Sequence, residues 1–286
     1  MLLIAYILFP IFFICTNLIG RDLQELINSG EIKTCFMGET TLELTHKELQ
    51  NLIGLENIPG IETVKVIDAS NNQIKKITAE TFIKCTQLEQ LILNNNQLED
   101  MLTSDTLKNL TNLRELHIKH NNLWVLDLNN FDSCRMLYVL NVGFNKINNI
   151  IPKKIGILDH LEVLYLNNNI LTELPSYAFS SCPDLQALYL QNNTLNKLQI
   201  NCFSGLKKLR LLYLQDNLLT KLSTSIFSDL NNLHILYLRN NALKELEVNW
   251  HIGLNRLHIL DLSYNELNSN IVSTNIGHVI YCYLFN

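Results

Sequence analysis

The sequence has few charged residues and no surplus of basic ones. Asp, Glu, Lys and Arg make up 17% of its 286 residues, below the usual quarter, and the formal net charge is −5. A nucleic-acid-binding domain carries a basic stripe, which this composition does not supply. We therefore expect no nucleic acid among the partners.

Motifs of the common enzyme classes are also missing. The chain has no G-x-S-x-G, no phosphate-binding Gly-rich loop and no H-E-x-x-H. Two histidine pairs are candidates for metal contact, His117 with His120 and His234 with His258, but no Cys or carboxylate completes a ligand set beside either. We predict solvated surface histidines, no metal, no cofactor and no enzymatic activity.

Only one long apolar run is present before the repeats, at residues 2–15. It is uncharged, it contains Pro10, and it is shorter than the roughly 20 residues of a membrane helix. This pattern predicts a secretory signal peptide over 1–20 and a mature chain beginning near Arg21. A retained signal anchor is the alternative. No later run is long enough to span a membrane and no lipid-anchor signal is visible, so we expect a secreted, extracellular protein.

The sequence does contain an internal repeat. Its eleven-residue pattern, LQALYLQNNTL at 185–195, has apolar residues at positions 1, 4, 6 and 11 and Asn at position 9. Copies are 24 residues apart except for a single interval of 25. They start at Val64, Leu88, Leu113, Leu137, Leu161, Leu185, Leu209, Leu233 and Leu257. Position 9 is Asn72, Asn96, Asn121, Asn145, Asn169, Asn193, Asn217, Asn241 and Asn265.

The repeat also predicts how each unit folds. Alternation at positions 3 to 7 is typical of a short strand, and successive strands would pair in parallel. An Asn at the turn after the strand can donate and accept hydrogen bonds for the backbone there, so we predict that the nine are structural. Further apolar residues stand at positions 14, 19 and 22. Position 19 reads Phe82, Leu107, Phe131, Ile155, Phe179, Phe203, Phe227 and His251, a predicted aromatic spine that fails at its last copy.

The pattern L-x-x-L-x-L-x-x-N-x-L at this period resembles the leucine-rich repeat. The chain looks like the 24-residue "typical" class found in Toll-like ectodomains, Slit-like proteins and small leucine-rich proteoglycans. This resemblance covers about 64–286. It implies an α/β leucine-rich repeat solenoid, or horseshoe, with one curved parallel sheet on the concave face and a mostly irregular or short-helical convex face. It implies protein binding as the class of function.

The resemblance suggests three segments: a signal peptide at 1–20, an N-terminal capping region at 21–62, and repeats at 63–286. The repeats comprise nine full copies and a partial tenth without a Cys-rich C-terminal cap. Segment 33–44 is interpreted as a hairpin across Gly38, with Leu42 and Leu44 at positions 4 and 6 of a degenerate repeat. Related caps usually hold four cysteines, whereas only Cys35 occurs here. The cap looks more like those of some arthropod secreted repeat proteins.

Repeat spacing argues against most disulfides among the seven cysteines. Cys85, Cys134 and Cys182 share position 22, and consecutive members are two repeats apart. Strands about 4.8 Å apart put them roughly 10 Å from one another, beyond the reach of a disulfide. We expect free thiols in the core. Cys35, Cys202 and Cys282 have no evident partner.

Two sequons, at Asn109 and Asn192, are candidates for glycosylation. Asn109 is the better candidate because Asn192 precedes the structural Asn193. Both remain open, since sequons arise by chance in a chain rich in Asn.

The concave face carries the candidate binding site, because strand positions 3, 5 and 7 point away from the core. Position 5 contains four consecutive tyrosines, position 3 is largely apolar, and position 7 offers amides and one cation. Tyr and Arg are enriched at protein interfaces. Stacked rings that only brace the sheet are the alternative. The predicted partner-binding residues are Tyr165, Tyr189, Tyr213, Tyr237, Arg239, Gln191 and Gln215.

These observations favour a secreted, non-enzymatic protein-binding scaffold that acts in innate immunity, adhesion or matrix. The alternative is a truncated ectodomain of a Toll-like or other leucine-rich repeat receptor. Tyr281 and Leu284 lie 24 residues after Leu257 and Leu260, so a tenth strand is expected to start there. Its uncapped apolar edge predicts either a truncated chain or self-association through that edge.

Overall fold

The computed structural model describes residues 21–36, 40–154, 156, 158–268 and 281–283. The predicted signal peptide at 1–20 lies outside these residues and stays a prediction. In the part of the chain that is described, no helix is long and apolar enough to cross a membrane.

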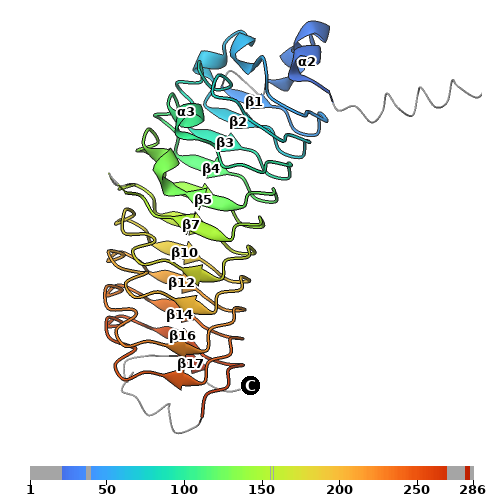
Figure 1. Cartoon of the computed structure of the whole chain (residues 1–286). Helices are drawn as coiled ribbons and strands as arrows, with labels where there is room; N and C mark the ends of the chain where they lie inside the picture. The colour runs from blue at the N-terminus through green and yellow to red at the C-terminus, as the bar shows by residue number, and fades with distance from the viewer. Residues whose placement is uncertain (1–20, 37–39, 155, 157, 269–280, 284–286) are drawn as a thin grey trace, which may run out of the picture.

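One parallel sheet runs the length of the described molecule, from β1 at the N-terminal end to β17 at the other (Figure 1). Each interior strand buries its middle residue, and its first and third residues are partly exposed except at Ala187 of β10, which is buried, so the strands follow period-2 alternation. Neighbouring strands pair in register one repeat apart. The described strands are β1 (Thr41–Glu43), β2 (Val66–Asp68), β3 (Gln90–Ile92), β4 (Glu115–His117), β6 (Val139–Asn141), β8 (Val163–Tyr165), β10 (Ala187–Tyr189), β12 (Leu211–Tyr213), β14 (Ile235–Tyr237), β16 (Ile259–Asp261) and β17 (Tyr281–Tyr283).

The core is a continuous column of leucines behind this sheet. In the repeat that starts at Leu185, the side chains at positions 1, 4, 6, 11, 19 and 22 are fully or almost fully buried. Leu198 at position 14 is only half-buried and packs against the edge of the core. Each repeat therefore covers its neighbours, which makes the stability a property of the array.

The side chain of the Asn at position 9 hydrogen-bonds the backbone of its own turn and that of the previous repeat. This is the structural role that was predicted for it. Asn193 accepts from the Leu171 amide at 3.1 Å and donates to the carbonyls of Leu166 and Leu190 at 3.0 and 2.9 Å. Asn96 makes the equivalent contacts near the other end of the molecule. The bonds satisfy backbone groups that are buried too deeply for water to reach.

The second half of each repeat contains short strands and turns. The pairs are β5 (Val125–Asp127) with β7 (Asn149–Ile151), β9 (Glu173–Leu174) with β11 (Lys197–Leu198), and β13 (Lys221–Leu222) with β15 (Glu245–Leu246). In the repeats, the described helical turns are α3 (Ser104–Leu107) and η4 (Leu128–Phe131). The predicted solenoid is confirmed, and the second halves of its repeats contain turns and short strands with little helix.

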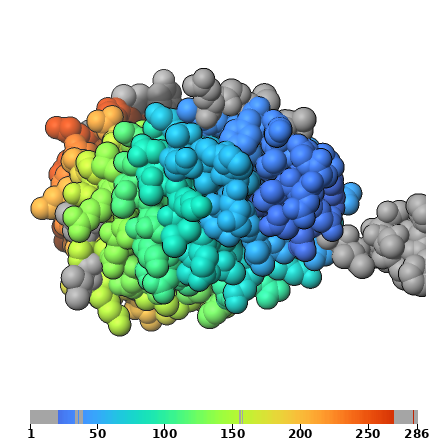
Figure 2. All heavy atoms as spheres, turned by 90° about the horizontal axis from the view of Figure 1, so that it is seen from above, coloured from blue at the N-terminus to red at the C-terminus, as the bar shows by residue number. Residues whose placement is uncertain are grey.

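The N-terminal region contains α2 (Leu23–Ser29), η1 (Glu31–Cys35), η2 (Leu55–Asn57) and η3 (Ile61–Thr63). Leu23 and Leu26 of α2 are fully buried and join the same core as the repeats. Seen from this end, residues of the region form a continuous surface beside the first repeats (Figure 2). Apolar packing thus contributes to closing the end of the core.

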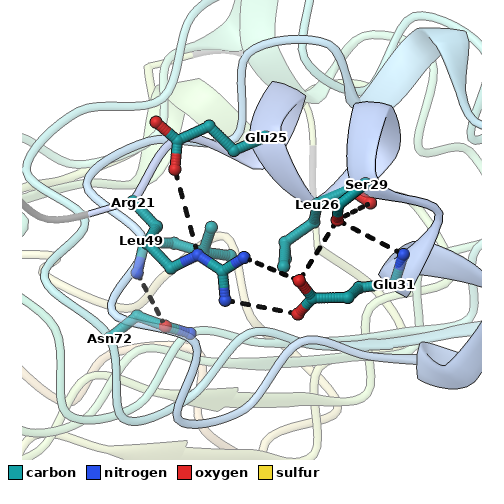
Figure 3. A network of polar contacts seen from close by, with 7 residues as sticks. All are labelled: Arg21, Glu25, Leu26, Ser29, Glu31, Leu49 and Asn72. Atoms are coloured by element: carbon teal, nitrogen blue, oxygen red, sulfur yellow. Dashed lines mark hydrogen bonds and ion pairs between the residues drawn. The ribbon is translucent and has the colours of Figure 1, made fainter.

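A polar network fixes the start of this region (Figure 3). The Arg21 guanidinium pairs with Glu31 through two contacts, at 3.0 and 3.3 Å, and Ser29 donates to the same carboxylate at 3.2 Å. The hydrogen bond from Arg21, followed by that from Ser29, lowers the pKa of Glu31. The Arg21 amide also donates to the Glu48 carbonyl at 2.9 Å, which ties residue 21 to the backbone of the fold.

The predicted hairpin at 33–44 is only partly correct. Its first arm is mainly the 3-10 helix η1, and the chain meets β1 in one antiparallel bridge, between Phe36 and Leu42. Gly38 lies outside the described residues. Leu42 does occupy position 4 of a degenerate repeat, since it pairs with Ile67 in β2.

The C-terminal end departs from the repeat in two ways. The aromatic spine at position 19 does not fail at His251, because the preceding Trp250 is fully buried and packs edge-on against Phe227. The centroids of these two rings are 6.2 Å apart. A further strand is present as predicted, but Tyr281 pairs with Ile259 at position 3, so the predicted register is wrong by two residues. Self-association through this edge stays a prediction.

Candidate functional site

The four tyrosines at position 5 form a stacked column, the tyrosine ladder, made of Tyr165, Tyr189, Tyr213 and Tyr237. Each is the third residue of its strand, and in-register pairing of β8, β10, β12 and β14 aligns them. Their ring centroids are 4.4, 4.8 and 5.2 Å apart in chain order, with interplanar angles of 11°, 13° and 38°. The predicted spacing of about 4.8 Å is confirmed.

The ladder is half-buried by its own stacking. Burial raises the pKa of Tyr189, and the neighbouring Tyr165 and Tyr213 raise it further. Burial likewise raises the pKa of Tyr213, with Tyr237 and Tyr165 adding to the effect. These two hydroxyls therefore remain protonated and able to donate at neutral pH.

An apolar column lies beside the ladder at position 3, where Ala187 is buried and Val163, Leu211 and Ile235 are half-buried. On the other side stands the amide column at position 7. The side-chain oxygens of Gln191 and Gln215 are buried and have no hydrogen-bond partner within the described structure. Buried polar atoms are usually satisfied, so these two are exceptions that call for an explanation.

Arg239 closes the C-terminal end of the ladder. Its guanidinium carbon lies 4.0 Å from the centroid of the Tyr264 ring, and Nη1 donates to the Ser263 hydroxyl at 3.4 Å. This cation-π contact holds an exposed charge at the rim. Sequence reasoning missed Tyr264, although its place at position 8 of the next repeat could have indicated it.

The sheet face before the ladder has different chemistry. Glu115 accepts from Gln90 at 2.7 Å and contacts the His117 ring at 3.0 Å, while Lys65 pairs with Glu89 at 2.9 Å. The remaining candidate histidines also lie against neighbouring rings, with His120 on Phe144 and His234 on His258. Among the described residues no group of three possible ligands is placed to hold a metal ion.

Four cysteines with described side chains are buried and form no disulfide: Cys85, Cys134, Cys182 and Cys202. The first three are the cysteines that were predicted to be free thiols in the core. Burial raises the pKa of Cys85 and Cys134 to about 12 and that of Cys182 to about 11. Burial raises the pKa of Cys202 as well. The side chains of Cys35 and Cys282 lie outside the description.

The two sequons differ in exposure. Asn192 is exposed at the turn beside the ladder, and Thr194 donates its hydroxyl to the Leu171 carbonyl at 3.0 Å. Asn109 is half-buried. Glycosylation stays a prediction at both.

Known proteins share this architecture. Lumican from Gallus gallus is 35% identical over 136 residues, which are 46% of this chain and 38% of lumican. The CD180 antigen of Mus musculus is 29% identical over 151 residues, covering 53% of this chain and 19% of that protein. The chain thus spans well under half the length of these curated relatives.

Two solved structures show the same fold. A chain in the octameric complex of Latrophilin 3, Unc5D and FLRT2 superposes with a TM-score of 0.66 at 22% identity, covering 86% of this chain and 81% of that one. A chain of the Drosophila Toll–Spatzle complex gives a TM-score of 0.64 at 22% identity, covering 86% and 38%. Identity at this level establishes the fold alone.

Family models match most of the repeat region. Residues 62–109 match the model described as Leucine Rich repeats (2 copies), and residues 111–169, 159–219 and 208–267 match the model described as Leucine rich repeat. These windows cover more than half of the chain, which therefore belongs to the leucine-rich repeat family.

Proposed function

We propose that this chain is a secreted, non-enzymatic scaffold that binds a protein partner on the concave face through the tyrosine ladder. The observation that carries the proposal is an uncharged aromatic column, flanked by apolar and amide columns, on a sheet face that is charged elsewhere. Innate immunity, adhesion and matrix assembly are the processes in which we expect such a scaffold to act.

The chemistry of the ladder suits the centre of a protein interface. Tyrosine rings supply apolar contact area at low rotamer cost, and their hydroxyls can hydrogen-bond a partner. The unpartnered oxygens of Gln191 and Gln215 would gain hydrogen bonds from donors on the bound surface. Arg239 adds a cation at the rim, where a charge contributes more to association rate than to affinity.

The relatives agree with this class of function. The two structurally similar chains were both solved in complexes with other proteins. Lumican and the CD180 antigen support an extracellular setting. We expect secretion when the chain is expressed in insect or mammalian cells with a C-terminal tag. Retention in the membrane fraction would contradict it.

The test of binding uses the tagged mature chain as bait in extracellular fluid, with matched variants alongside. A specific partner should be captured by the wild type and by Lys197→Ala, which alters an exposed residue of β11 in the second half of its repeat. It should be lost or much reduced with Tyr189→Ala and Tyr213→Ala. Capture that is equal for all four proteins would overturn the site.

Tyr189→Phe separates binding from bracing, because it keeps the ring stack and removes the hydroxyl. An interface that uses the hydroxyl predicts weaker binding with an unchanged melting temperature. If the rings only brace the sheet, Tyr189→Ala lowers the melting temperature, Tyr189→Phe is neutral, and the partner's affinity for both variants stays that of the wild type.

The alternative function is that of a receptor ectodomain. The likeness to the CD180 antigen and to the chain in the Toll–Spatzle complex favours it. A longer transcript that encodes a membrane span would support this reading, and the ladder would then be the ligand site of the receptor.

A further inference from the structure

Positive charge gathers where the chain enters strands β12, β14 and β16. The entering segments are KKLRL at 207–211, NNLHI at 231–235 and NRLHI at 255–259. They contain four cations and no carboxylate, although the chain as a whole has a net charge of −5. We call the four cations, Lys207, Lys208, Arg210 and Arg256, the basic strip.

Hydrogen bonds between successive repeats bring the members of the strip together. The His234 amide donates to the Arg210 carbonyl at 2.8 Å, which sets these two residues side by side, one repeat apart. The side-chain oxygen of Asn232 accepts from Arg256 Nη1 at 2.8 Å, while its nitrogen donates to the Lys207 carbonyl at 2.7 Å. The guanidinium of Arg256 therefore reaches toward the preceding turn of the solenoid, on the side of Lys207 and Arg210.

The carboxylates nearest the strip do not balance its charge. Asp184 pairs with Lys208 at 2.7 Å. Asp229 accepts from the Gly205 amide at 2.7 Å and stays an anion, so it offsets one more cation. With both carboxylates counted against the four cations, two positive charges remain in excess.

Two further carboxylates lie beyond the limits of the strip. Glu162, the preceding acidic residue at position 2, is two repeats before Arg210, or about 10 Å away. Asp261 lies on the concave face and accepts from the Ser263 hydroxyl at 2.6 Å. Arg239 donates to the same hydroxyl at 3.4 Å, so Asp261 has a cation of its own at the rim of the ladder.

Cations at the same place in earlier repeats are neutralised. Lys65 and Arg114 also stand at position 2, and both contact Glu89 of the repeat between them, at 2.9 and 3.9 Å. By contrast, the side chains of Lys207 and Arg210 are exposed and make no hydrogen bond or ion pair with a described residue. The basic strip therefore has charge available for a ligand.

The strip is continuous with the tyrosine ladder. Arg210 directly precedes β12, whose third residue is Tyr213, so the two lie about 10 Å apart along the strand. Leu211, which is apolar and half-buried, stands between them. A ligand that covers both surfaces must present apolar groups to the ladder and anions to the strip. A protein segment offers both, whereas a sulfated glycan has no apolar side chains.

We propose that the basic strip docks an acidic segment of the protein partner whose apolar surface covers the tyrosine ladder. This inference rests on the proposed function. Carboxylates of the segment pair with Arg210 and Arg256, because the planar guanidinium group matches the geometry of a carboxylate. The pairing orients the partner and speeds its association, as charges at the rim of an interface do.

A synthetic probe tests the strip without the partner. The full chain is titrated into a fluorescein-labelled oligoglutamate at low salt, with an oligoglutamine of the same length beside it, and fluorescence anisotropy is measured. We expect saturable binding of oligoglutamate alone, weakened as salt rises. Arg210→Gln with Arg256→Gln should weaken it about tenfold, the loss expected for two exposed ion pairs. Lys65→Gln with Arg114→Gln removes the same charge from neutralised sites and should weaken it far less.

The outcomes separate the strip from the ladder. No saturable binding of oligoglutamate, or equal losses in the two double variants, overturns the proposal. Binding of a heparin fragment without binding of oligoglutamate assigns the strip to a sulfated glycan and overturns it too. Tyr189→Ala should leave oligoglutamate binding intact, so a failure of the ladder in the capture test is distinguishable from a failure of the strip.

Association kinetics connect the strip to the captured partner. Arg210→Gln with Arg256→Gln should slow association and reduce its dependence on salt, whereas Tyr189→Ala should speed dissociation. An association rate that the double variant leaves unchanged would mean that the partner does not use the strip, and it would overturn the proposal.

Discussion

Two parts of the main sheet, β2 to β4 and β8 to β14, have the same backbone and different surface chemistry. Between β2 and β4 the solvent-facing strand residues include Asp68, Glu115 and His117, and several of them hydrogen-bond one another. Between β8 and β14 the corresponding residues are aromatic or aliphatic, and none is charged. The solenoid thus accepts either chemistry on this face.

The comparison shows which residues the fold needs. Buried apolar residues and the position 9 Asn recur in both parts, so they carry the architecture. Polar groups of the charged part find partners inside the protein, while Gln191 and Gln215 beside the ladder retain unpartnered oxygens. A surface that is not internally satisfied has hydrogen-bonding capacity left for a ligand. This difference is the physical reason for assigning binding to the ladder.

The largest expected effect is the loss of stability when a position 9 Asn is replaced, and it should be equal in the two parts of the sheet. Replacing Asn96 or Asn193 with alanine leaves the Ile74 or Leu171 amide without its partner, at about 1–3 kcal/mol for a buried group. The carbonyls to which each Asn donates keep a second hydrogen bond from the Asn of a neighbouring repeat. We expect each variant to lose up to about 3 kcal/mol in the free energy of unfolding, measured by urea denaturation. The exposed neighbour change Asn192→Asp should lose little. Strongly unequal losses would mean that the two parts do not share one architecture.

The second-largest expected effect is on the affinity for the partner, which should differ between variants in the two parts of the sheet. Tyr189→Ala is expected to weaken binding of the captured partner by about 2 kcal/mol, which raises Kd roughly thirtyfold. His117→Ala should leave Kd unchanged. Titration calorimetry measures both. A greater loss with His117→Ala would move the interface to the charged part.

Alkaline stability should distinguish them more weakly. Burial raises the pKa of Tyr189 in the folded state, so its stabilising effect is complete below the unfolded value near pH 10 and is lost as pH rises through the folded pKa. The buried thiols act in the same direction. Tyr189→Phe should therefore lose less stability than the wild type above about pH 10, whereas Glu115→Gln should follow the wild type. Parallel pH profiles for all three proteins would argue against a desolvated ladder.

The smallest effect concerns the sequons, one in each part. Exposure favours Asn192 over Asn109, which reverses the preference drawn from sequence. In secretory cells we expect Asn192→Asp to remove one glycan-dependent step in gel mobility and Asn109→Asp to change nothing. Both variants should unfold like the wild type. Loss of the step with Asn109→Asp alone would restore the earlier preference.

Much of the molecule was predictable because its repeat is strict. The spacing of leucines gave the strands and their register, the invariant Asn gave the turn, and the position 5 residues gave a tyrosine column with the correct separation. The prediction of free thiols at Cys85, Cys134 and Cys182 followed from the same arithmetic and is confirmed by their burial. Each of these properties depends only on sequence position within a periodic structure.

Sequence alone determined the solenoid, its core and the ladder, because a 24-residue period leaves one way to bury every leucine. The tertiary structure decided what happens where the period ends or changes. There, Trp250 replaces the expected spine residue, β17 pairs two residues out of the predicted register, and α3 forms in the repeat that has the extra residue. Packing between non-equivalent segments sets these features, and the repeat pattern does not encode it.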